Sequence, residues 1–255
     1  MTMAIPARAS RPGRSNAGRR SLLYRRATYP RREMTPPAPA HGPRPWLLPA
    51  LAVVSAASAV WSFAGAHDKP TWAFEVLPLG AVMLVFAARR RGFRFSDLAY
   101  VLLTWFFLIQ CLGGRYTFAA VPFPQAWMDA LGLDRNPVDR IGHFFQGFVP
   151  AILLREWLIR RRGMPAGGTV FGLVTGCCLA FSASYELLEM AVVLVFYPDA
   201  GPDWLGMQGD PWDAQWDMTM ALSGALLAQL LLGRLHDRSM ARTDPGHWAG
   251  RRGRA

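Results

Sequence analysis

Three otherwise apolar stretches of this sequence contain side chains that could do chemistry. They are "DRIGHFFQGF" (139–148), "SASYELLEM" (182–190) and "QGDPWDAQWDM" (208–218). An imidazole beside several carboxylates can bind a cation, hold a metal ion or move a proton. The candidate residues of this polar site are Asp139, Arg140, His143, Gln146, Tyr185, Glu186, Glu189, Asp210, Asp213 and Asp217.

Helical spacing gathers these residues on three polar faces. Asp139, His143 and Gln146 recur at i, i+4 and i+7, so they share one face of a helix. The two glutamates of the second stretch share a face in the same way, and Asp213 and Asp217 are one turn apart in the third. The spacing therefore predicts one cavity, lined by three helices, in which these groups meet each other or water.

Burial makes such a cavity costly unless it has a use. A charged side chain deep in a membrane helix costs at least ~2.5–3.5 kcal/mol on insertion scales. A purely structural hydrogen-bond network returns only ~0.6 kcal/mol per bond on average in measured cases. The balance favours a functional cavity over a structural network, with Arg140 or Arg115 neutralising part of the negative charge.

A metal site is one form that this cavity could take. His143, Glu189 and Asp217 are the candidate ligands, and their donor atoms suit Zn²⁺, Mn²⁺ or iron. The sequence contains no HExxH, no paired ExxH and no GxSxG motif. The sequence therefore assigns no metal content, no cofactor and no catalytic residue.

The elements that must position these residues are membrane helices. Of the 255 residues, 52% are hydrophobic and only 18% are charged, which is typical of a membrane protein. Segments of about 20 apolar residues cross a bilayer as helices. The composition thus predicts an all-α, polytopic bundle of about six helices. The apolar stretches lie near residues 46–66, 71–88, 97–114, 141–159, 168–197 and 214–233.

The basic residues predict the topology. The net charge is +11, yet the arginines cluster between apolar runs, as the positive-inside rule requires, and no nucleic-acid-binding motif accompanies them. With both termini in the cytoplasm, the inner segments hold 23 arginines, whereas the outer segments hold four basic residues. We therefore expect an N-in, C-in protein of the bacterial inner membrane, with the lipid bilayer as its partner and no nucleic acid.

The two ends of the chain differ from this membrane domain. Residues 1–45 are rich in Arg and Pro, and we expect them to be a disordered cytoplasmic segment. The six-helix domain is expected at 46–235, and a basic cytoplasmic tail at 236–255. Two alternatives stay open, namely translation from Met34 and cleavage after "AGA" (64–66).

One helix also carries a stripe of small residues at every fourth position. Such a stripe lets neighbouring helix backbones approach closely. The pattern predicts that this helix is packed on two sides and central. The stripe consists of Gly168, Gly172, Gly176, Ala180 and Ser184.

The three polar motifs resemble the signature of a YjdF-like family of bacterial inner-membrane proteins of unknown function. The matching segments are 139–156, 182–190 and 208–218, and the resemblance spans about residues 46–235. It implies a multi-helix inner-membrane protein and supplies no reaction. The layout is also similar, at the level of pattern, to VanZ-like proteins, which are linked to glycopeptide-antibiotic tolerance at the cell envelope. The Asn that follows the last helix's Asp in those proteins is not evident here.

Three classes of function fit these observations. The first is an outward-facing cavity that binds an amphiphilic or glycopeptide-like envelope ligand. The second is a membrane enzyme, metal-assisted or not, and the third is a proton-coupled transporter. The sequence shows no inverted repeat and a polar entry from one side only, which argues against transport.

Overall fold

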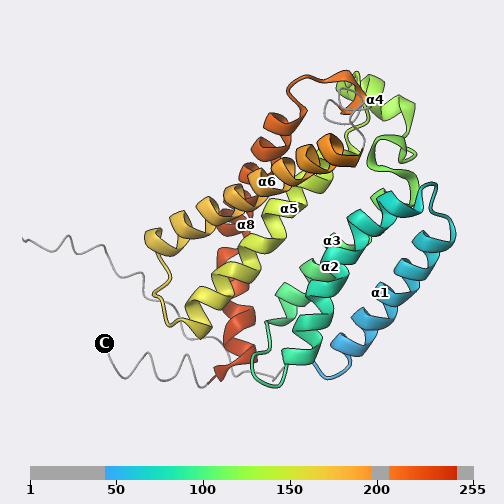
Figure 1. Ribbon diagram of the computed structural model, residues 1–255. Coiled ribbons are helices and arrows are strands. Elements are labelled where there is room, and N and C mark those ends of the chain that lie inside the picture. The colour runs from blue at the N-terminus through green and yellow to red at the C-terminus, as the bar shows by residue number, and fades with distance from the viewer. Residues whose placement is uncertain (1–43, 197–206, 246–255) are drawn as a thin grey trace, which may run out of the picture. The chain divides into compact units, whose positions relative to one another are not determined.

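A computed structural model describes residues 44–196 and 207–245 (Figure 1). These residues form helices and turns without a strand, which confirms the predicted all-α bundle. The long helices are α1 (Leu47–Ala64), α2 (Lys69–Arg89), α3 (Asp97–Tyr116), α5 (Val138–Glu156), α6 (Gly168–Phe196) and α8 (Asp213–Thr243). The short elements are α4 (Gln125–Leu131), two 3-10 turns (Phe118–Ala120 and Met207–Gly209) and a π-helical turn (Trp157–Arg161). The expected disorder of the N-terminal segment falls on residues that lie almost entirely outside the described part.

Five of the long helices are long and apolar enough to cross a membrane; α5 is the exception. It carries Asp139 and Arg140 near its start and Arg155 and Glu156 at its end. This helix packs against α3, α6 and α8, so its polar side chains face other helices and not lipid. Asp139, Arg155 and Glu156 are all buried.

The centre of the bundle is the close pair formed by α5 and α8. Two glycines make the approach possible. A Cβ atom on Gly147 would lie 1.8 Å from the carbonyl oxygen of Ala221, and one on Gly224 would lie 2.0 Å from that of Phe144. Both contacts are with the backbone of the facing helix, which cannot move aside as a side chain can.

The small-residue stripe on α6 does not have the predicted role. A Cβ atom on Gly168, Gly172 or Gly176 would meet no atom within 4 Å among the described residues. The stripe is exposed, and α6 packs on α5 and α8 by its opposite side. The expectation of a central helix packed on both sides was therefore wrong, because regular spacing of small residues permits a close contact without saying which helix makes it.

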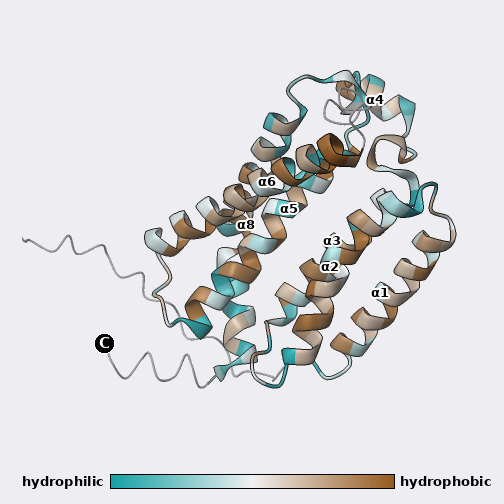
Figure 2. Cartoon of the chain, in the orientation of Figure 1, coloured by the Kyte–Doolittle hydropathy of each residue, from teal (hydrophilic) through white to brown (hydrophobic). Residues whose placement is uncertain are grey.

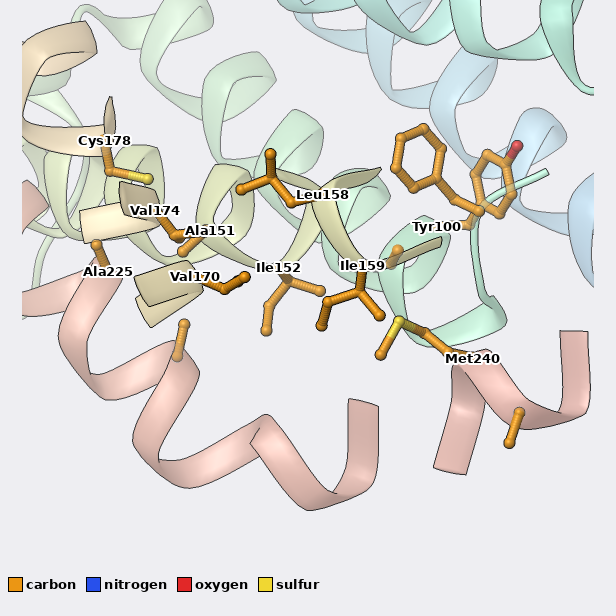
Figure 3. Packing of buried hydrophobic residues seen from close by; sticks show 14 residues of the cluster. Tyr100, Ala151, Ile152, Leu158, Ile159, Val170, Val174, Cys178, Ala225 and Met240 are labelled. Atoms are coloured by element: carbon orange, nitrogen blue, oxygen red, sulfur yellow. The ribbon is translucent and has the colours of Figure 1, made fainter. Parts of the chain in front are cut away.

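The largest hydrophobic core lies between α3, α5, α6 and α8. Figure 3 shows Ile152 of α5 and Ile159 of the π-helical turn together with Val174 of α6 and Met240 of α8, all of them buried. The outward faces of α1, α2 and α6 are strongly hydrophobic (Figure 2). They carry exposed apolar side chains, such as Val60 at 70% exposure, and suit contact with lipid tails.

The last helix continues past the predicted domain boundary at residue 235. It ends at Thr243, and its final turns bury His236, Met240 and Ala241 against the core. This segment is polar in sequence, but its buried side faces other helices, so hydropathy alone does not mark it as part of the bundle. Residues 246–255 of the expected tail lie outside the described part.

The loops at the two ends of the bundle differ in charge. The α2–α3 and α5–α6 connections and the end of α8 lie at one end, away from α4 (Figure 1). This end holds the arginine clusters at 89–94 and 160–162. At the opposite end, Asp68 caps α2, and hydrogen bonds from the Thr71 hydroxyl and backbone N–H hold the pKa of its carboxyl below its usual range.

This arrangement makes topology directly testable. Reporter fusions after Arg91, after Arg162 and at the C-terminus are expected to read as cytoplasmic, because arginine-rich loops stay inside. Fusions at Asp68 and Asp134 are expected to read as external. Alkaline phosphatase and green fluorescent protein activities measured on the same fusion points check the result. An external C-terminus would contradict the assigned orientation.

Candidate functional site

A cavity of about 600 Å³ lies among α2, α3, α5, α6 and α8. It lies near the start of α5 and of α8, in the half of the bundle that the predicted topology places in the outer leaflet. We call it the acid–histidine cavity. Eight sequence-predicted residues line it, namely Asp139, His143, Gln146, Tyr185, Glu186, Glu189, Asp213 and Asp217.

His143 stands at the meeting point of three helices. Its Nε2 lies 3.8 Å from Asp139 Oδ1 and 3.7 Å from Asp217 Oδ2. Its Nδ1 lies 3.7 Å from Glu186 Oε1 and 2.8 Å from Gln146 Oε1. The three polar faces expected from helical spacing therefore come together at this imidazole.

The contact with Gln146 favours one tautomer of the ring. An amide oxygen only accepts, so this contact is a hydrogen bond when the Nδ1 of His143 carries a proton. In the neutral imidazole, Nε2 then presents its lone pair toward the carboxylates of Asp139 and Asp217. Three electron-rich groups facing one another need a cation between them, either a proton or a metal ion.

Two arginines neutralise the acids at the outer end of the cavity. Arg135 contacts Asp213 at 2.5 Å, Asp210 at 3.3 Å and Asp139 at 3.6 Å. Arg140 contacts Asp210 at 2.5 Å. Neither Arg140 nor Asp210 lines the cavity, so both belong to the ion-pair cluster above it.

One of the two arginines that the sequence suggested as partners of the acids has a different role. Arg115 was a candidate to neutralise the acids, but its guanidinium donates to the carbonyl oxygen of Trp61 and lies over the rings of Trp61 and Tyr116. It ties α3 to α1 instead. The role expected of it belongs to Arg135, whose place in a loop gave no periodic signal.

Glu75 on α2 is a cavity residue that the sequence reasoning missed. It lines the cavity, and its carboxylate accepts a hydrogen bond from Gln110 Nε2 at 3.3 Å. Glu189 on α6 is close enough to Glu75 and to His143 to interact with both electrostatically. The sequence could have identified Glu75, because it is the single acid inside the second apolar run. An ionisable residue inside a membrane helix is a functional-site candidate by default.

Several buried polar atoms facing this region have no hydrogen-bond partner among the described residues. They are Asp217 Oδ1, Glu186 Oε1 and Ser182 Oγ. Asp217 is only 3% exposed. Unpaired buried oxygens cost free energy and are unusual in native proteins, so they point to a group that binds there.

The rest of the cavity wall is apolar. Leu79 and Val82 of α2 and Phe181 and Leu187 of α6 belong to this apolar part of the lining. Val82 is 40% exposed and Leu187 is 61% exposed, so the apolar part of the lining reaches the surface that faces lipid. The lining thus combines carboxylates with apolar side chains, some of which are exposed on the outside of the bundle.

A second polar cluster lies at the end of the bundle that the predicted topology places in the cytoplasm. The carboxylate of Glu156, fully buried, accepts hydrogen bonds from Ser96 N at 2.7 Å and Ser96 Oγ at 2.6 Å. It also pairs with Arg160 and, at 3.0 Å, with His236 Nε2, while Arg155 contacts the other ring nitrogen of His236. This cluster joins α3, α5 and α8, and both oxygens of Glu156 and both ring nitrogens of His236 have partners in it, as a structural role requires.

The comparisons with known proteins agree with a membrane protein. A family described as "Predicted membrane protein (DUF2238)" matches residues 47–238, from the start of α1 into the last turns of α8. The chain is 41% identical over 201 residues to the protein described as "Inner membrane protein YjdF" from Escherichia coli (strain K12), covering 78% of this chain and 95% of that protein. No solved structure matches. The resemblance to a YjdF-like family and the multi-pass inner-membrane location are confirmed.

Proposed function

We propose that this chain, which belongs to the DUF2238 family of predicted membrane proteins, binds an amphiphilic amine in the acid–histidine cavity. The observation that carries the proposal is the composition of the cavity lining, which joins carboxylates to apolar side chains. A ligand with a positively charged head group and a hydrocarbon part matches both kinds of side chain. Such molecules partition into the outer leaflet of the membrane, next to the cavity.

The charge of the lining supports a cationic head group. Six carboxylic side chains line the cavity, and no Arg or Lys does. Asp139 and Asp213 share Arg135. The remaining acids of α2 and α6 have no Arg or Lys within ion-pair distance in the described part of the chain; they are Glu75, Glu186 and Glu189. A group held by these three glutamates must carry positive charge, because a buried anion there would add to the repulsion.

The apolar part of the lining supports a ligand with a hydrocarbon tail and suggests its route of entry. Ligand cavities commonly have volumes of about 300–1,000 Å³ and bury most of an apolar ligand among hydrophobic side chains. Here the side chains of α2 and α6 that line the cavity are also exposed toward lipid. An amphiphile can therefore enter sideways from the bilayer without passing through water.

A matched pair of probes tests this proposal. We expect a dansyl-labelled long-chain alkylamine to bind the protein, purified in a neutral sugar detergent, more tightly than a dansyl-labelled fatty acid of equal length. Glu189→Gln is expected to weaken the amine at least about tenfold, because a hydrogen bond to a charged group contributes about 1.5–3 kcal/mol. Dansyl fluorescence titrations, with empty micelles as background, measure both affinities.

Asp129→Asn is the matched control. Asp129 is an exposed acid on α4, outside the cavity, so the same carboxylate-to-amide change should leave amine binding as it is. Equal binding of the two probes, or equal loss in the control and in Glu189→Gln, would contradict the proposal.

Transport or conversion of the ligand would add a later step to this binding, and flux of the bound amine across proteoliposomes distinguishes a transporter.

A further inference from the structure

We propose that Asp139, His143 and Asp217 bind one divalent transition-metal ion, Zn²⁺ or Mn²⁺, in the wall of the acid–histidine cavity. This inference deepens the proposed function and rests on it in one respect, since it takes the cavity as a place where cations bind. The ion would occupy the α5–α8 side of the cavity. The three glutamates from α2 and α6 would remain for the head group of the ligand.

The geometry of the three side chains carries the inference. One ligand atom from each of Asp139, His143 and Asp217 lies within 4.8 Å of the other two. The imidazole Nε2 lies 3.8 Å and 3.7 Å from the two carboxylate oxygens. Ligand atoms about 2.0–2.2 Å from a tetrahedral ion are about 3.4 Å apart, so small side-chain rotations would complete the site.

The second observation is the unpaired oxygen of Asp217. This residue is 3% exposed and lines the cavity, yet its Oδ1 has no hydrogen-bond partner in the described part of the chain. Its other oxygen, Oδ2, lies 3.7 Å from His143 Nε2, beyond hydrogen-bond distance, where a proton on that nitrogen or a bound metal ion would balance its charge. A buried carboxylate with both oxygens in such surroundings is stabilised by a cation and by little else.

The groups behind the ligands are also those of a metal site. His143 donates its Nδ1 proton to Gln146, which fixes the ring so that Nε2 is free to coordinate. Asp139 is held from behind by Arg135, at 3.6 Å. Three protein ligands leave a fourth position open for water or another ligand from the cavity. Glu186 lies near the other ring nitrogen, with its Oε1 3.7 Å from His143 Nδ1.

The donor set selects the class of ion. Imidazole nitrogen suits Zn²⁺, iron and related metals, whereas carboxylate oxygen suits Mn²⁺ and Mg²⁺. One nitrogen with two carboxylates therefore favours Zn²⁺ or Mn²⁺ over Mg²⁺, which prefers oxygen ligands and its own water shell. Two carboxylates also balance the charge of one divalent ion, so the loaded site is neutral and tolerable at membrane depth.

The experiment measures metal binding directly. The full-length protein, purified in detergent and stripped with a chelator, is dialysed against micromolar Zn²⁺ or Mn²⁺ and its metal content determined by elemental analysis. We expect one ion per chain. Asp217→Asn and His143→Gln are expected to lose stoichiometric binding, and Gln146→Leu to weaken it about 10–100-fold, as loss of a supporting hydrogen bond does elsewhere. Visible absorption of the Co²⁺-loaded protein reports a nitrogen ligand independently of stoichiometry.

Asp129→Asn again serves as control and should retain the ion. A wild-type protein that takes up no stoichiometric ion at micromolar concentration overturns the inference, as does an ion retained by both Asp217→Asn and His143→Gln. Binding of the dansyl alkylamine is titrated in parallel on the chelator-treated wild type. Failure of the metal site with retained amine binding is then distinct from failure of the cavity as a ligand site, in which the amine does not bind.

Discussion

Alanine in place of Gly147 is expected to push α5 away from α8 and to destabilise the protein strongly. The added methyl group would lie 1.8 Å from a backbone oxygen of the facing helix, so relief requires movement of a whole helix. Overpacking of a core usually costs about 1–3 kcal/mol, and contact with backbone places this change at or above the upper end of that range. Titration of the protein in mixed micelles with sodium dodecyl sulfate, which unfolds it, measures the decrease in the free energy of unfolding.

Gly224→Ala is expected to behave similarly, because its new methyl group would lie 2.0 Å from the backbone oxygen of Phe144. Gly176→Ala is the matched control. Its methyl group would meet no described atom within 4 Å, and alanine favours the helix over glycine. Equal stability of Gly147→Ala and wild type would contradict the central α5–α8 contact. A large loss in Gly176→Ala would instead indicate that another molecule covers the exposed face of α6.

These glycines illustrate what periodicity can and cannot tell. The stripe on α6 is the more regular pattern, and it drew the expectation of close packing. The close contact is made by Gly147 and Gly224. Gly224 lies in a less regular run of small residues on α8, with Ala221, Ala225 and Ala228, all of them buried. Spacing along one helix reports which residues share a face. It does not report which face meets another helix, since that depends on the arrangement of all six.

The same limit divides the candidate site. Residues that share a helix face could be grouped from the sequence, and His143 does lie near Asp139, Glu186 and Asp217. Arg135 could not be placed, because it reaches the acids from a loop. The metal ligands proposed from the sequence were His143, Glu189 and Asp217, whereas the ligand atoms that lie within 4.8 Å of one another belong to Asp139, His143 and Asp217. Whether Glu189 or Asp139 is the third ligand depends on the distance of α6 from α5 and α8. The spacing of residues along a helix does not predict that distance.

Hydropathy also gives no indication of the cluster around Glu156 and His236. Glu156 ends α5 next to a run of arginines, where a charged residue is usual at a membrane boundary. His236 follows the last apolar stretch (214–233), so the sequence places it at the start of the basic tail. In the structure both are fully buried and hydrogen-bonded to each other at 3.0 Å. Their pairing comes from the meeting of α5 and α8, two helices about 80 residues apart in sequence.

Removal of Glu156 is therefore expected to be among the most damaging single changes. Glu156→Ala would leave the Ser96 backbone N–H, the His236 ring and the Arg160 guanidinium without their acceptor in a buried place. Loss of one partner from a buried ion pair costs about 3–5 kcal/mol. We expect a decrease of that size in the free energy of unfolding, measured in the same mixed micelles.

Asp97→Ala provides the control on the same end of the bundle. Asp97 pairs with Arg94 at 2.9 Å, but both side chains are about a quarter exposed, and such surface pairs contribute only about 0–1 kcal/mol. A loss below about 1 kcal/mol in Glu156→Ala, similar to that of the control, would show that the cluster does not hold α3, α5 and α8 together. Because Glu156 lies at the opposite end from the acid–histidine cavity, the folded fraction of Glu156→Ala should still bind the dansyl alkylamine with wild-type affinity. A parallel loss of binding would instead mean that the two ends are coupled through α5, the helix that carries both Glu156 and His143.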